Sequence, residues 1–299
     1  MSNRIHYSHC PVCRSSQIDP LITVQDHSVS GETFVVWQCH QCSLRFTQDV
    51  PDAESIGPYY KSADYISHTN TSKGFINKAY QTVRNYTLKQ KAKLIQKYTG
   101  QQQGKLLDVG AGTGAFLLQM KKEGWETTGV EPDADARKVA LRDFGLPLLE
   151  SHCLYTLPQM HFDAITMWHV LEHVHDLHGQ VAHLKTLLKP RGKLIVAVPN
   201  YQALDADIYK PYWAAYDVPR HLYHFTPQAI QTLMQQHGLK VVDTKPMWFD
   251  AFYISLLSSK YQWGRSRLIG SFISGLRSNL KALSDEKRCS SLIYIIEQA

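Results

Sequence analysis

The stretch that decides the fold is Leu106-Leu-Asp-Val-Gly-Ala-Gly-Thr-Gly-Ala-Phe116. A short apolar run precedes three glycines at alternate positions, Gly110, Gly112 and Gly114, and an apolar, helix-like segment follows them. Glycines adopt backbone conformations that other residues avoid, and they let a ligand lie against the bare main chain. The N-terminus of a helix adds free N–H groups to such a site. The stretch therefore predicts a buried strand, a ligand-binding loop and a helix.

Around this loop, short apolar runs alternate with segments of helical periodicity. We expect strands at 105–109, 126–130, 146–150 (weakly marked), 164–168, 193–198, 239–245 and 291–297. We expect helices at 73–99, 116–124, 134–144, 181–188 and 226–238. Strict alternation of strands and helices predicts an α/β fold with a doubly wound, seven-stranded and mostly parallel sheet.

The glycine loop alone leaves two cofactor classes open. Gly110, Gly112 and Ala115 also fit the dinucleotide fingerprint, and Glu131 follows Gly110 by 21 residues, where a ribose-binding acid belongs. Asp108 favours the other class, because a carboxylate just before the glycines can receive an ammonium group. A dinucleotide fold normally keeps that position apolar.

Two distal segments complete the motif set, Phe162-Asp-Ala-Ile-Thr166 and Leu187-Leu-Lys-Pro-Arg-Gly-Lys-Leu-Ile-Val196. Together with the loop they resemble the class I S-adenosylmethionine-dependent methyltransferases, over roughly residues 90–298. The resemblance implies a Rossmann-like sheet whose last strand is antiparallel.

The resemblance also implies a cofactor site for S-adenosylmethionine. Asp108 and the backbone of the glycine loop would hold the methionine end, Glu131 would accept both ribose hydroxyls, and Trp168 and His169 would lie along the sulfonium. The cofactor-binding residues expected on this basis are Asp108, Gly110, Ala111, Gly112, Gly114, Glu131, Pro132, Trp168 and His169.

Four of the six cysteines form two pairs near the N-terminus. Cys10 and Cys13, like Cys39 and Cys42, are separated by two residues, which lets both thiolates of a pair reach one tetrahedral ion. Four thiolates suit structural zinc and leave no open position for catalysis. A redox motif would be a single pair, and the neighbouring His9 and His40 are alternative ligands. We expect a zinc ribbon over residues 1–48 that needs its metal to fold.

A further pattern, His169-Val-Leu-Glu-His173, matches the H-x-x-E-H signature of a zinc peptidase. Such a signature belongs inside a helix. Here it begins where a strand should end, within a cofactor-binding fold. We therefore interpret it as part of the cofactor and acceptor cleft, as similar stretches are in the methyltransferase family.

The segment 213–225 is dense in aromatic and titratable residues. It follows the fifth expected strand, beyond the carboxyl ends of the sheet, where such folds bind ligands. Methyl transfer needs positioning and a base, and a histidine can remove the acceptor proton at neutral pH. The candidate catalytic bases are His221 first, then His173 and His224. Arg220 could bind an anionic acceptor or pair internally with Asp217.

Composition excludes several classes of protein. The chain has 299 residues, 43% hydrophobic and 19% charged, which excludes a disordered protein. No apolar run is long enough for a membrane span and no secretory signal is evident, so we expect a cytoplasmic protein without a membrane partner. The net charge of +6 is concentrated at 65–107, which holds eight basic residues and no acid. This segment is either a solvated helix face or a surface for phosphate-bearing partners.

The expected organisation is a zinc ribbon at 1–48, a linker at 49–72 and a methyltransferase domain at 73–299 with insertions at 201–225 and 248–290. We expect transfer of a methyl group from S-adenosylmethionine to a small molecule, such as a sugar or other metabolite, because the ribbon resembles the module found ahead of this domain in sugar C-methyltransferases. The alternatives are an RNA methyltransferase that uses the ribbon and segment 65–107, an NAD-dependent oxidoreductase, and a non-catalytic scaffold. Monomer and homodimer both remain open, since 248–290 could be a substrate lid or a dimerisation arm.

Overall fold

A six-stranded sheet lies at the centre of the computed structural model, which describes residues 3–61 and 75–299. Its strands stand in the order β11-β12-β9-β8-β6-β7. They are β6 (Lys105–Val109), β7 (Glu126–Val130), β8 (Phe162–Trp168), β9 (Leu188–Pro199), β11 (Leu239–Pro246) and β12 (Ser291–Gln298). Strands β7, β6, β8 and β9 pair in parallel, and β12 runs antiparallel between β9 and β11. The α/β prediction and the antiparallel last strand are both confirmed.

The third expected strand, at 146–150, is reduced to a single bridge. Leu149 pairs with Val130 beyond the edge of the sheet, through hydrogen bonds to Gly129 and Glu131. Pro147 has no N–H to give to a ladder, so pairing cannot spread along this segment. The sheet therefore has six strands, not seven, in the described part of the chain.

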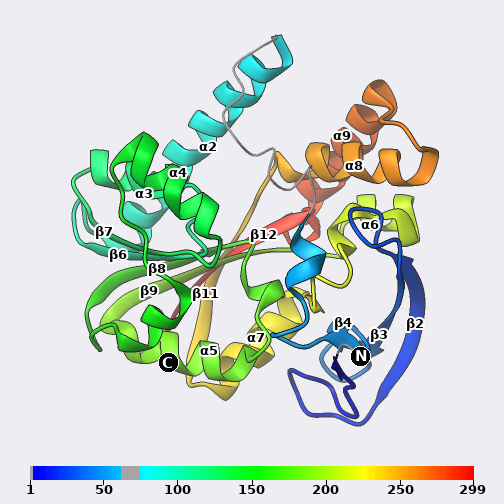
Figure 1. Ribbon diagram of the computed structural model, residues 1–299, viewed down its shortest axis with the longest axis horizontal. Helices are drawn as coiled ribbons and strands as arrows, with labels where there is room; N and C mark the ends of the chain where they lie inside the picture. Colours follow the sequence, from blue (N-terminus) through cyan, green and yellow to red (C-terminus); the bar gives the residue numbers. More distant parts are fainter. Residues whose placement is uncertain (1–2, 62–74) are drawn as a thin grey trace.

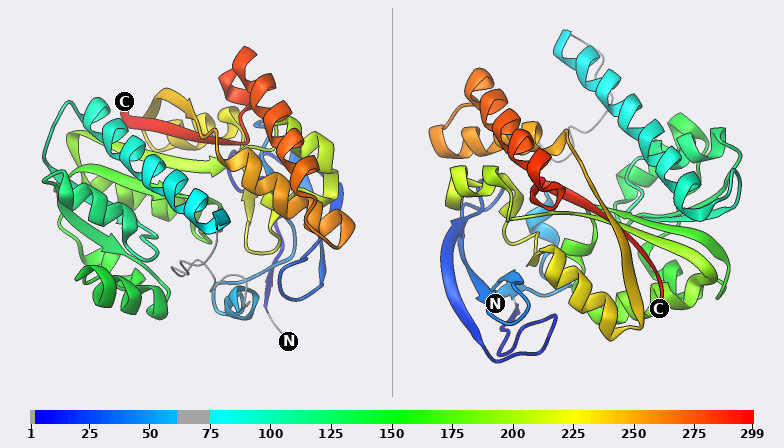
Figure 2. Two further views of the ribbon diagram at one scale, coloured as in Figure 1. Left: turned by 90° about the horizontal axis from the view of Figure 1, so that it is seen from above. Right: turned by 180° about the vertical axis from the view of Figure 1, so that it is seen from behind.

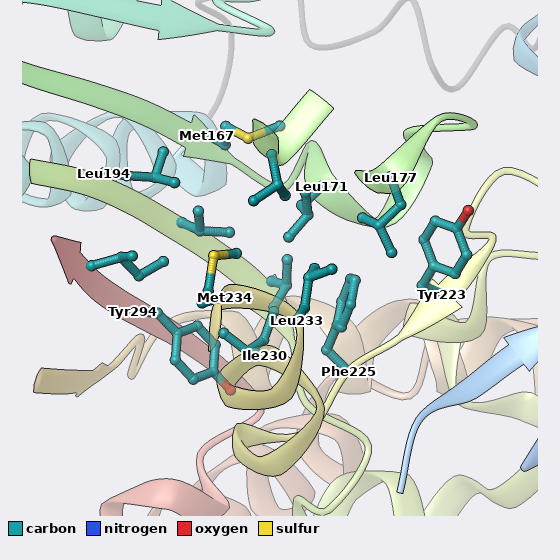
Figure 3. Packing of buried hydrophobic residues seen from close by; sticks show 14 of the residues in the cluster. Met167, Leu171, Leu177, Leu194, Tyr223, Phe225, Ile230, Leu233, Met234 and Tyr294 are labelled. Atoms are coloured by element: carbon teal, nitrogen blue, oxygen red, sulfur yellow. The ribbon is translucent and has the colours of Figure 1, made fainter. Parts of the chain in front are cut away.

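Helices cover both faces of the sheet (Figures 1 and 2). They are α2 (Phe75–Thr99), α3 (Ala115–Lys122) and α4 (Ala134–Phe144) on one face, and α5 (Leu177–Leu187) and α7 (Pro227–Gln236) on the other. Alternate residues of each strand supply the two cores, as the pleat requires. Leu106 of β6 packs with Met120 of α3, whereas its neighbour Leu107 shares a core with Leu233 of α7. Figure 3 shows the second core, with Met167, Leu194 and Tyr294 of the sheet facing α7.

The N-terminal segment forms a second, antiparallel sheet of β2 (Ile18–Gln25), β3 (Thr33–Cys39), β4 (Arg45–Thr47) and β10 (Tyr223–His224). Its fourth strand comes from the C-terminal half of the chain, because β10 pairs with β4 through Tyr223–Phe46 and His224–Arg45. The cysteine pairs also belong to the same apolar core as α7. The N-terminal segment is thus built into the main fold.

The segment expected as a linker contains ordered structure. β5 (Val50–Pro51) pairs with β1 (Arg4–Ile5), and a short 3-10 helix, η1 (Gly57–Tyr60), buries Tyr59. The rest of the expected linker, at 62–72, lies outside the described residues.

The two expected insertions are helical. The first holds α6 (Leu204–Tyr209), the 3-10 turns η4 (Lys210–Tyr212) and η5 (Ala214–Tyr216), and β10. The second holds α8 (Asp250–Trp263), α9 (Leu268–Ser284) and η6 (Glu286–Arg288). Among the described residues, no helix combines the length and the apolar character that crossing a bilayer requires.

Candidate functional site

The glycine loop joins β6 to α3 at the carboxyl edge of the sheet. Gly110, Gly112 and Gly114 have φ values of +74°, +54° and +79°, which side-chain-bearing residues rarely adopt. A Cβ at Gly110 would lie 2.4 Å from Val170, whereas at Gly112 no atom lies within 4 Å of that position. The backbone at Gly112 is therefore open to a ligand.

Asp108, at the end of β6, is a buried carboxylate beside this loop. It is 2% exposed, and Thr166 donates a hydrogen bond of 2.6 Å to it from β8. Burial raises the pKa of Asp108 to about 7, although the Thr166 hydrogen bond and the charge of Lys91 act in the opposite direction. A cation near Asp108 would favour its ionised form.

Lys91 of α2 already places a cation near this position. Its Nζ lies 4.0 Å from the centre of the Trp168 ring, and the charges of Asp108 and Asp250 act on it. Burial lowers the pKa of Lys91 to about 8 in spite of these carboxylates. The aromatic face and the two carboxylates form an environment suited to a positively charged group.

Glu131 follows β7 and is held by two backbone N–H groups. It accepts hydrogen bonds from Gly112 at 2.7 Å and from Asp133 at 2.9 Å. It is 7% exposed, and burial raises its pKa. The next residue is Pro132, whose carbonyl accepts from Arg137. The glycine loop and this carboxylate are thus fixed to each other, as a shared ligand site requires.

His169 directly follows β8 in the left-handed conformation, with φ of +57°. Its Nε2 lies 3.0 Å from Asp250, and its Nδ1 lies 3.4 Å from Glu172. Burial acts to lower its pKa, but these two carboxylates outweigh burial and raise the pKa of His169 to about 10. His169 is therefore a cation at neutral pH and cannot serve as a base.

A cleft of about 620 Å³ runs beside these residues, between α2 and the segment that joins β11 to α8. Lys91 and Asp250 line one part of it, and the aromatic side chains of Tyr86, Trp248 and Phe249 line another. The cleft therefore combines apolar surface with charged groups next to Trp168 and His169.

His173 and His221 lie together, with ring centres 4.6 Å apart. His221 Nδ1 is 2.9 Å from the carbonyl of Ala215, and His173 Nδ1 is 2.9 Å from the carbonyl of Arg220. A carbonyl only accepts, so both Nδ1 atoms carry hydrogen, and in the neutral rings both Nε2 atoms keep a lone pair. Burial lowers the pKa of His173 to about 4, so this ring is neutral.

Glu172 lies close to these histidines. One ligand atom from each of Glu172, His173 and His221 lies within 4.8 Å of the others. Glu172 is wholly buried, and neither of its carboxylate oxygens has a hydrogen-bond partner within the described residues. Its carboxylate forms an ion pair with His169.

His224, the third candidate base, is in a different environment. It is 3% exposed under β4, and its Nε2 lies 3.2 Å from Thr47 Oγ1. Burial holds its pKa well below the usual value. Its contacts fit a structural role in the joint between the two sheets.

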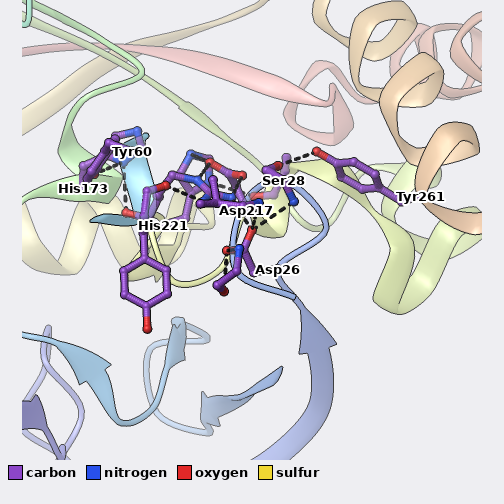
Figure 4. Close-up of polar contacts among 12 residues, drawn as sticks. Asp26, Ser28, Tyr60, His173, Asp217, His221 and Tyr261 are labelled. Carbon is purple, nitrogen blue, oxygen red and sulfur yellow. Dashed lines mark hydrogen bonds and ion pairs between the residues drawn. The ribbon is translucent and has the colours of Figure 1, made fainter. Parts of the chain in front are cut away.

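Arg220 fixes the loop that carries His221. Its guanidinium bonds Asp217 at 2.7 Å and Asp26 of the N-terminal segment at 2.9 Å, and it donates to the Tyr59 carbonyl. Figure 4 shows this network with His173 and Tyr60 at one end and Ser28 and Tyr261 at the other. The interpretation of Arg220 as internally paired fits this geometry.

The four N-terminal cysteines form a cluster that could hold a metal. All four Sγ atoms lie within 4.8 Å of one another, and Cys10–Cys42 and Cys13–Cys39 are each 3.5 Å apart. None is in a disulfide. Tetrahedral zinc with Zn–S bonds of about 2.3 Å needs sulfurs at a similar spacing. Cys153 and Cys289 lie outside the cluster.

The structure adds residues that the sequence did not single out. The basic segment 65–107 suggested that Lys91 lies on the protein surface, but in the structure its side chain lies over the Trp168 ring. Asp250 had one usable signal, since it follows β11 at the carboxyl edge where ligands bind. Asp26 and Thr47 had no such signal in the sequence, because their partners lie far away along the chain.

The H-x-x-E-H stretch, His169–His173, begins just after strand β8 and continues into a 3-10 turn, η3 (Leu171–His173), as expected from its context.

Comparison with known proteins assigns the chain to a family. Residues 80–244, more than half of the chain, match the family model described as a methyltransferase domain. The mitochondrial ubiquinone biosynthesis O-methyltransferase of Rattus norvegicus is 25% identical over 164 residues, or 50% of this chain and 48% of that protein. The ubiquinone biosynthesis O-methyltransferase of Glaesserella parasuis is 31% identical over 116 residues, or 33% of this chain and 47% of that protein. The chain thus spans about half the length of these curated relatives.

Among solved structures, a SAM-dependent methyltransferase from Archaeoglobus fulgidus has the same fold. It superimposes with a TM-score of 0.50 at 19% identity, covering 72% of this chain and 94% of that one.

Proposed function

The chain belongs to the methyltransferase domain family, and from this membership and the geometry of its site we propose that it transfers a methyl group from S-adenosylmethionine to a small-molecule acceptor. The observation that carries the proposal is the buried Asp108 carboxylate next to the open backbone of Gly112. A methionine ammonium group finds there the negative charge it needs.

The residues present fit this cofactor in charge and shape. Asp108 would bind the ammonium, and Glu131, held by Gly112, would accept from the ribose hydroxyls. Trp168 already holds the Lys91 cation over its ring, and this supports an environment that tolerates the positive charge of a sulfonium beside it. S-adenosylmethionine, once bound, supplies the electrophilic methyl group. A dinucleotide fits less well, because its pyrophosphate would approach the Asp108 carboxylate.

We assign the acceptor to the cleft beside Asp250, which offers aromatic surface next to Trp168 and His169. The methyl group is displaced in line, so the chain mainly has to hold the acceptor against the sulfonium and exclude water. His169 joins the two parts of the site, because it pairs with Asp250, which lines this cleft, and with Glu172, which lies beside His173 and His221.

His221 is our candidate general base, with His173 beside it. In its neutral form each ring has an Nε2 lone pair, since a backbone carbonyl holds the Nδ1 hydrogen. The His221 side chain is 12% exposed, so it is within reach of a solute. A positioned base of this kind contributes about 10²–10⁴-fold to the rate. The buried Glu172 would stabilise the imidazolium that forms.

We also propose that Cys10, Cys13, Cys39 and Cys42 hold a structural zinc ion. Four thiolates leave the ion no open position, so its role is to fold the N-terminal segment. That segment in turn supports the loop of His221.

The proposal is tested by offering methyl-tritiated S-adenosylmethionine to fractionated small molecules, total RNA and protein from the source cell. Label in a small-molecule fraction supports it. Label in RNA alone would favour nucleic-acid methylation, whose binding should weaken steeply with salt. His221→Gln should lower the turnover rate by about 10²-fold or more with little change in cofactor affinity. His183→Gln serves as the matched control, since His183 lies in α5 with its Nε2 3.0 Å from the Leu154 carbonyl, outside the proposed site.

A further inference from the structure

Helix α9 has an unusual arrangement of side chains. The residues it packs against the protein are small, namely Ser271, Gly275, Ser278 and Ala282. A Cβ on Gly275 would lie 2.8 Å from the Phe252 ring, so α8 and α9 are in close contact there. The inner face is therefore already filled by small residues and has no room for larger ones.

The large apolar residues of α9 are largely exposed instead, although the Phe272 ring also stacks on Phe252 of α8. Those that are exposed include Ile269, Phe272, Ile273, Leu276, Leu280 and Leu283. At about 100° per residue these six fall within an arc of roughly 100°, opposite the small residues. Ile269 is 78% exposed and Leu283 68%. Soluble proteins rarely leave so continuous an apolar surface uncovered.

The surroundings of this surface are basic. Residues 251–284 contain no Asp or Glu but include Arg265, Arg267, Arg277 and Lys281, all exposed. Asp285 and Glu286, beyond the end of α9, are followed by Lys287 and Arg288, so this end adds no net negative charge. Arg277 lies at the edge of the apolar arc, and Arg265 and Arg267 precede its N-terminal end. An apolar face bordered by Arg and Lys is the pattern of a helix that lies in the plane of an anionic bilayer surface.

We propose that α9 docks on the surface of an anionic lipid bilayer, with its apolar face in the acyl boundary and its basic residues at the headgroups. Figures 1 and 2 show α8 and α9 as a pair at the edge of the molecule, so that α9 can reach a flat surface. The inference goes beyond the proposed methyl transfer and does not depend on it.

Charge favours a bilayer over a second copy of the chain. If two α9 helices paired through this face, the basic residues at its border would approach their own copies, without a carboxylate from 251–284 to offset them. Like charges brought together in an interface are unfavourable. Anionic headgroups supply the missing counter-charge.

Docking through α9 would place the proposed site close to the bilayer. Helix α8, against which α9 packs, begins at Asp250, and Asp250 pairs with His169. The aromatic side chains of Trp248 and Phe249, just before α8, line the cleft. The helix pair is thus a direct extension of the site.

Cosedimentation of the full chain with vesicles tests the proposal. The protein should bind vesicles of equal parts phosphatidylcholine and phosphatidylglycerol, and bind pure phosphatidylcholine much less. Ile269→Glu together with Leu283→Glu should abolish binding. Because both residues are largely exposed, this variant should keep the melting temperature of the wild type. Arg265→Glu and Arg277→Glu should each weaken binding by about 30-fold, since each exchange changes the charge by two units worth about 1 kcal/mol apiece.

Leu141→Glu is the matched control, since Leu141 is 58% exposed on α4, away from α9. It should bind vesicles as the wild type does. Equal binding to both kinds of vesicle, or none to either, would overturn the proposal. So would self-association in light scattering that Ile269→Glu abolishes in a protein that ignores vesicles, because the face would then be an interface between copies.

Discussion

Asp26 and Arg220 form a buried ion pair with a distance of 2.9 Å, although 194 positions separate them in the sequence. Their side chains are 0% and 3% exposed. Nearby, Thr47 of β4 donates a hydrogen bond to the carbonyl of His221. The N-terminal segment therefore holds the loop that carries the candidate base, and four predictions follow from this and the site around it.

Asp26→Asn should destabilise the protein and displace His221. Arg220 would keep Asp217 and the Tyr59 carbonyl as partners, so we expect the lower end of the cost of breaking a buried ion pair, about 3 kcal/mol in urea unfolding. Arg220→Met should cost more, about 5 kcal/mol, because it leaves two carboxylates without their cation. Both variants should also reduce turnover.

Asp19→Asn is the control for this prediction. Asp19 pairs with His40, but both side chains are more than half exposed, so the change should cost less than about 1 kcal/mol. If Asp26→Asn unfolds at the same urea concentration as Asp19→Asn, the buried pair does not stabilise the joint between the segments.

Removal of the metal should abolish methyl transfer while S-adenosylmethionine still binds. The Cys39→Ser variant, or a strong chelator, should unfold the sheet formed by β2, β3 and β4, since structural zinc accounts for much of the folding energy of such modules. The loss of β4 would release β10 and the His221 loop, whereas Asp108 and Glu131 lie in the main sheet.

Mass spectrometry of the intact protein under native conditions should find one zinc ion, and calorimetry should find an unchanged cofactor affinity in Cys39→Ser. Cys153→Ser, outside the cluster, should keep both zinc and activity. A wild-type protein that carries no metal would refute the four-cysteine site.

Glu131→Gln should weaken cofactor binding by about 10–100-fold, as expected for the loss of a charged hydrogen-bond acceptor worth about 1.5–3 kcal/mol. The glutamine keeps one carbonyl oxygen, which can still accept from Gly112 and hold the loop, whereas its NH2 group would replace the oxygen that accepts from Asp133. Calorimetry with S-adenosylhomocysteine measures the affinity without turnover. Glu123→Gln, an exposed residue at the end of α3, should bind as the wild type does. Equal affinities in the two variants would remove Glu131 from the ribose site.

Local patterns predicted much of the fold. β6 and β7 begin and end at the residues expected from their apolar runs, and the Thr226 cap with Pro227 marks the start of α7. The third strand was misjudged because its apolar residues suggest pairing that Pro147 prevents. At this segment the missing N–H of Pro147 has a larger effect on strand pairing than the hydrophobic pattern has.

The site was predictable only where it lies on one local motif. The glycine loop and Glu131 face each other because adjacent parallel strands bring their carboxyl ends to one edge. The cation environment of Lys91 and the Asp26–Arg220 pair depend on how α2 and the N-terminal segment pack on that edge. Such contacts leave no periodic signal in the sequence, and a basic run gives no sign of which lysine points inward.

Asp108→Asn should stabilise the folded protein but weaken its binding of S-adenosylmethionine. Burial raises the pKa of Asp108 from an ordinary value of 3.8 to about 7, so between these pH values the folded protein binds a proton that the unfolded chain has lost. The unfolding free energy of the wild type should therefore fall as pH rises through this interval, by up to about 1.4 kcal/mol for each unit of the shift. Asparagine does not titrate, so the variant should gain stability relative to the wild type from pH 4 to pH 7, yet bind S-adenosylmethionine far more weakly. Measurements below pH 7 keep Lys91, whose pKa is about 8, charged throughout.

Thr166→Val is a second test of the same carboxylate. The Thr166 hydrogen bond lowers the pKa of Asp108, so its loss should extend the interval of falling stability to higher pH. If the wild type and Asp108→Asn show the same dependence of unfolding free energy on pH, the buried carboxylate is not protonated in the free protein and the ammonium site has to be sought elsewhere.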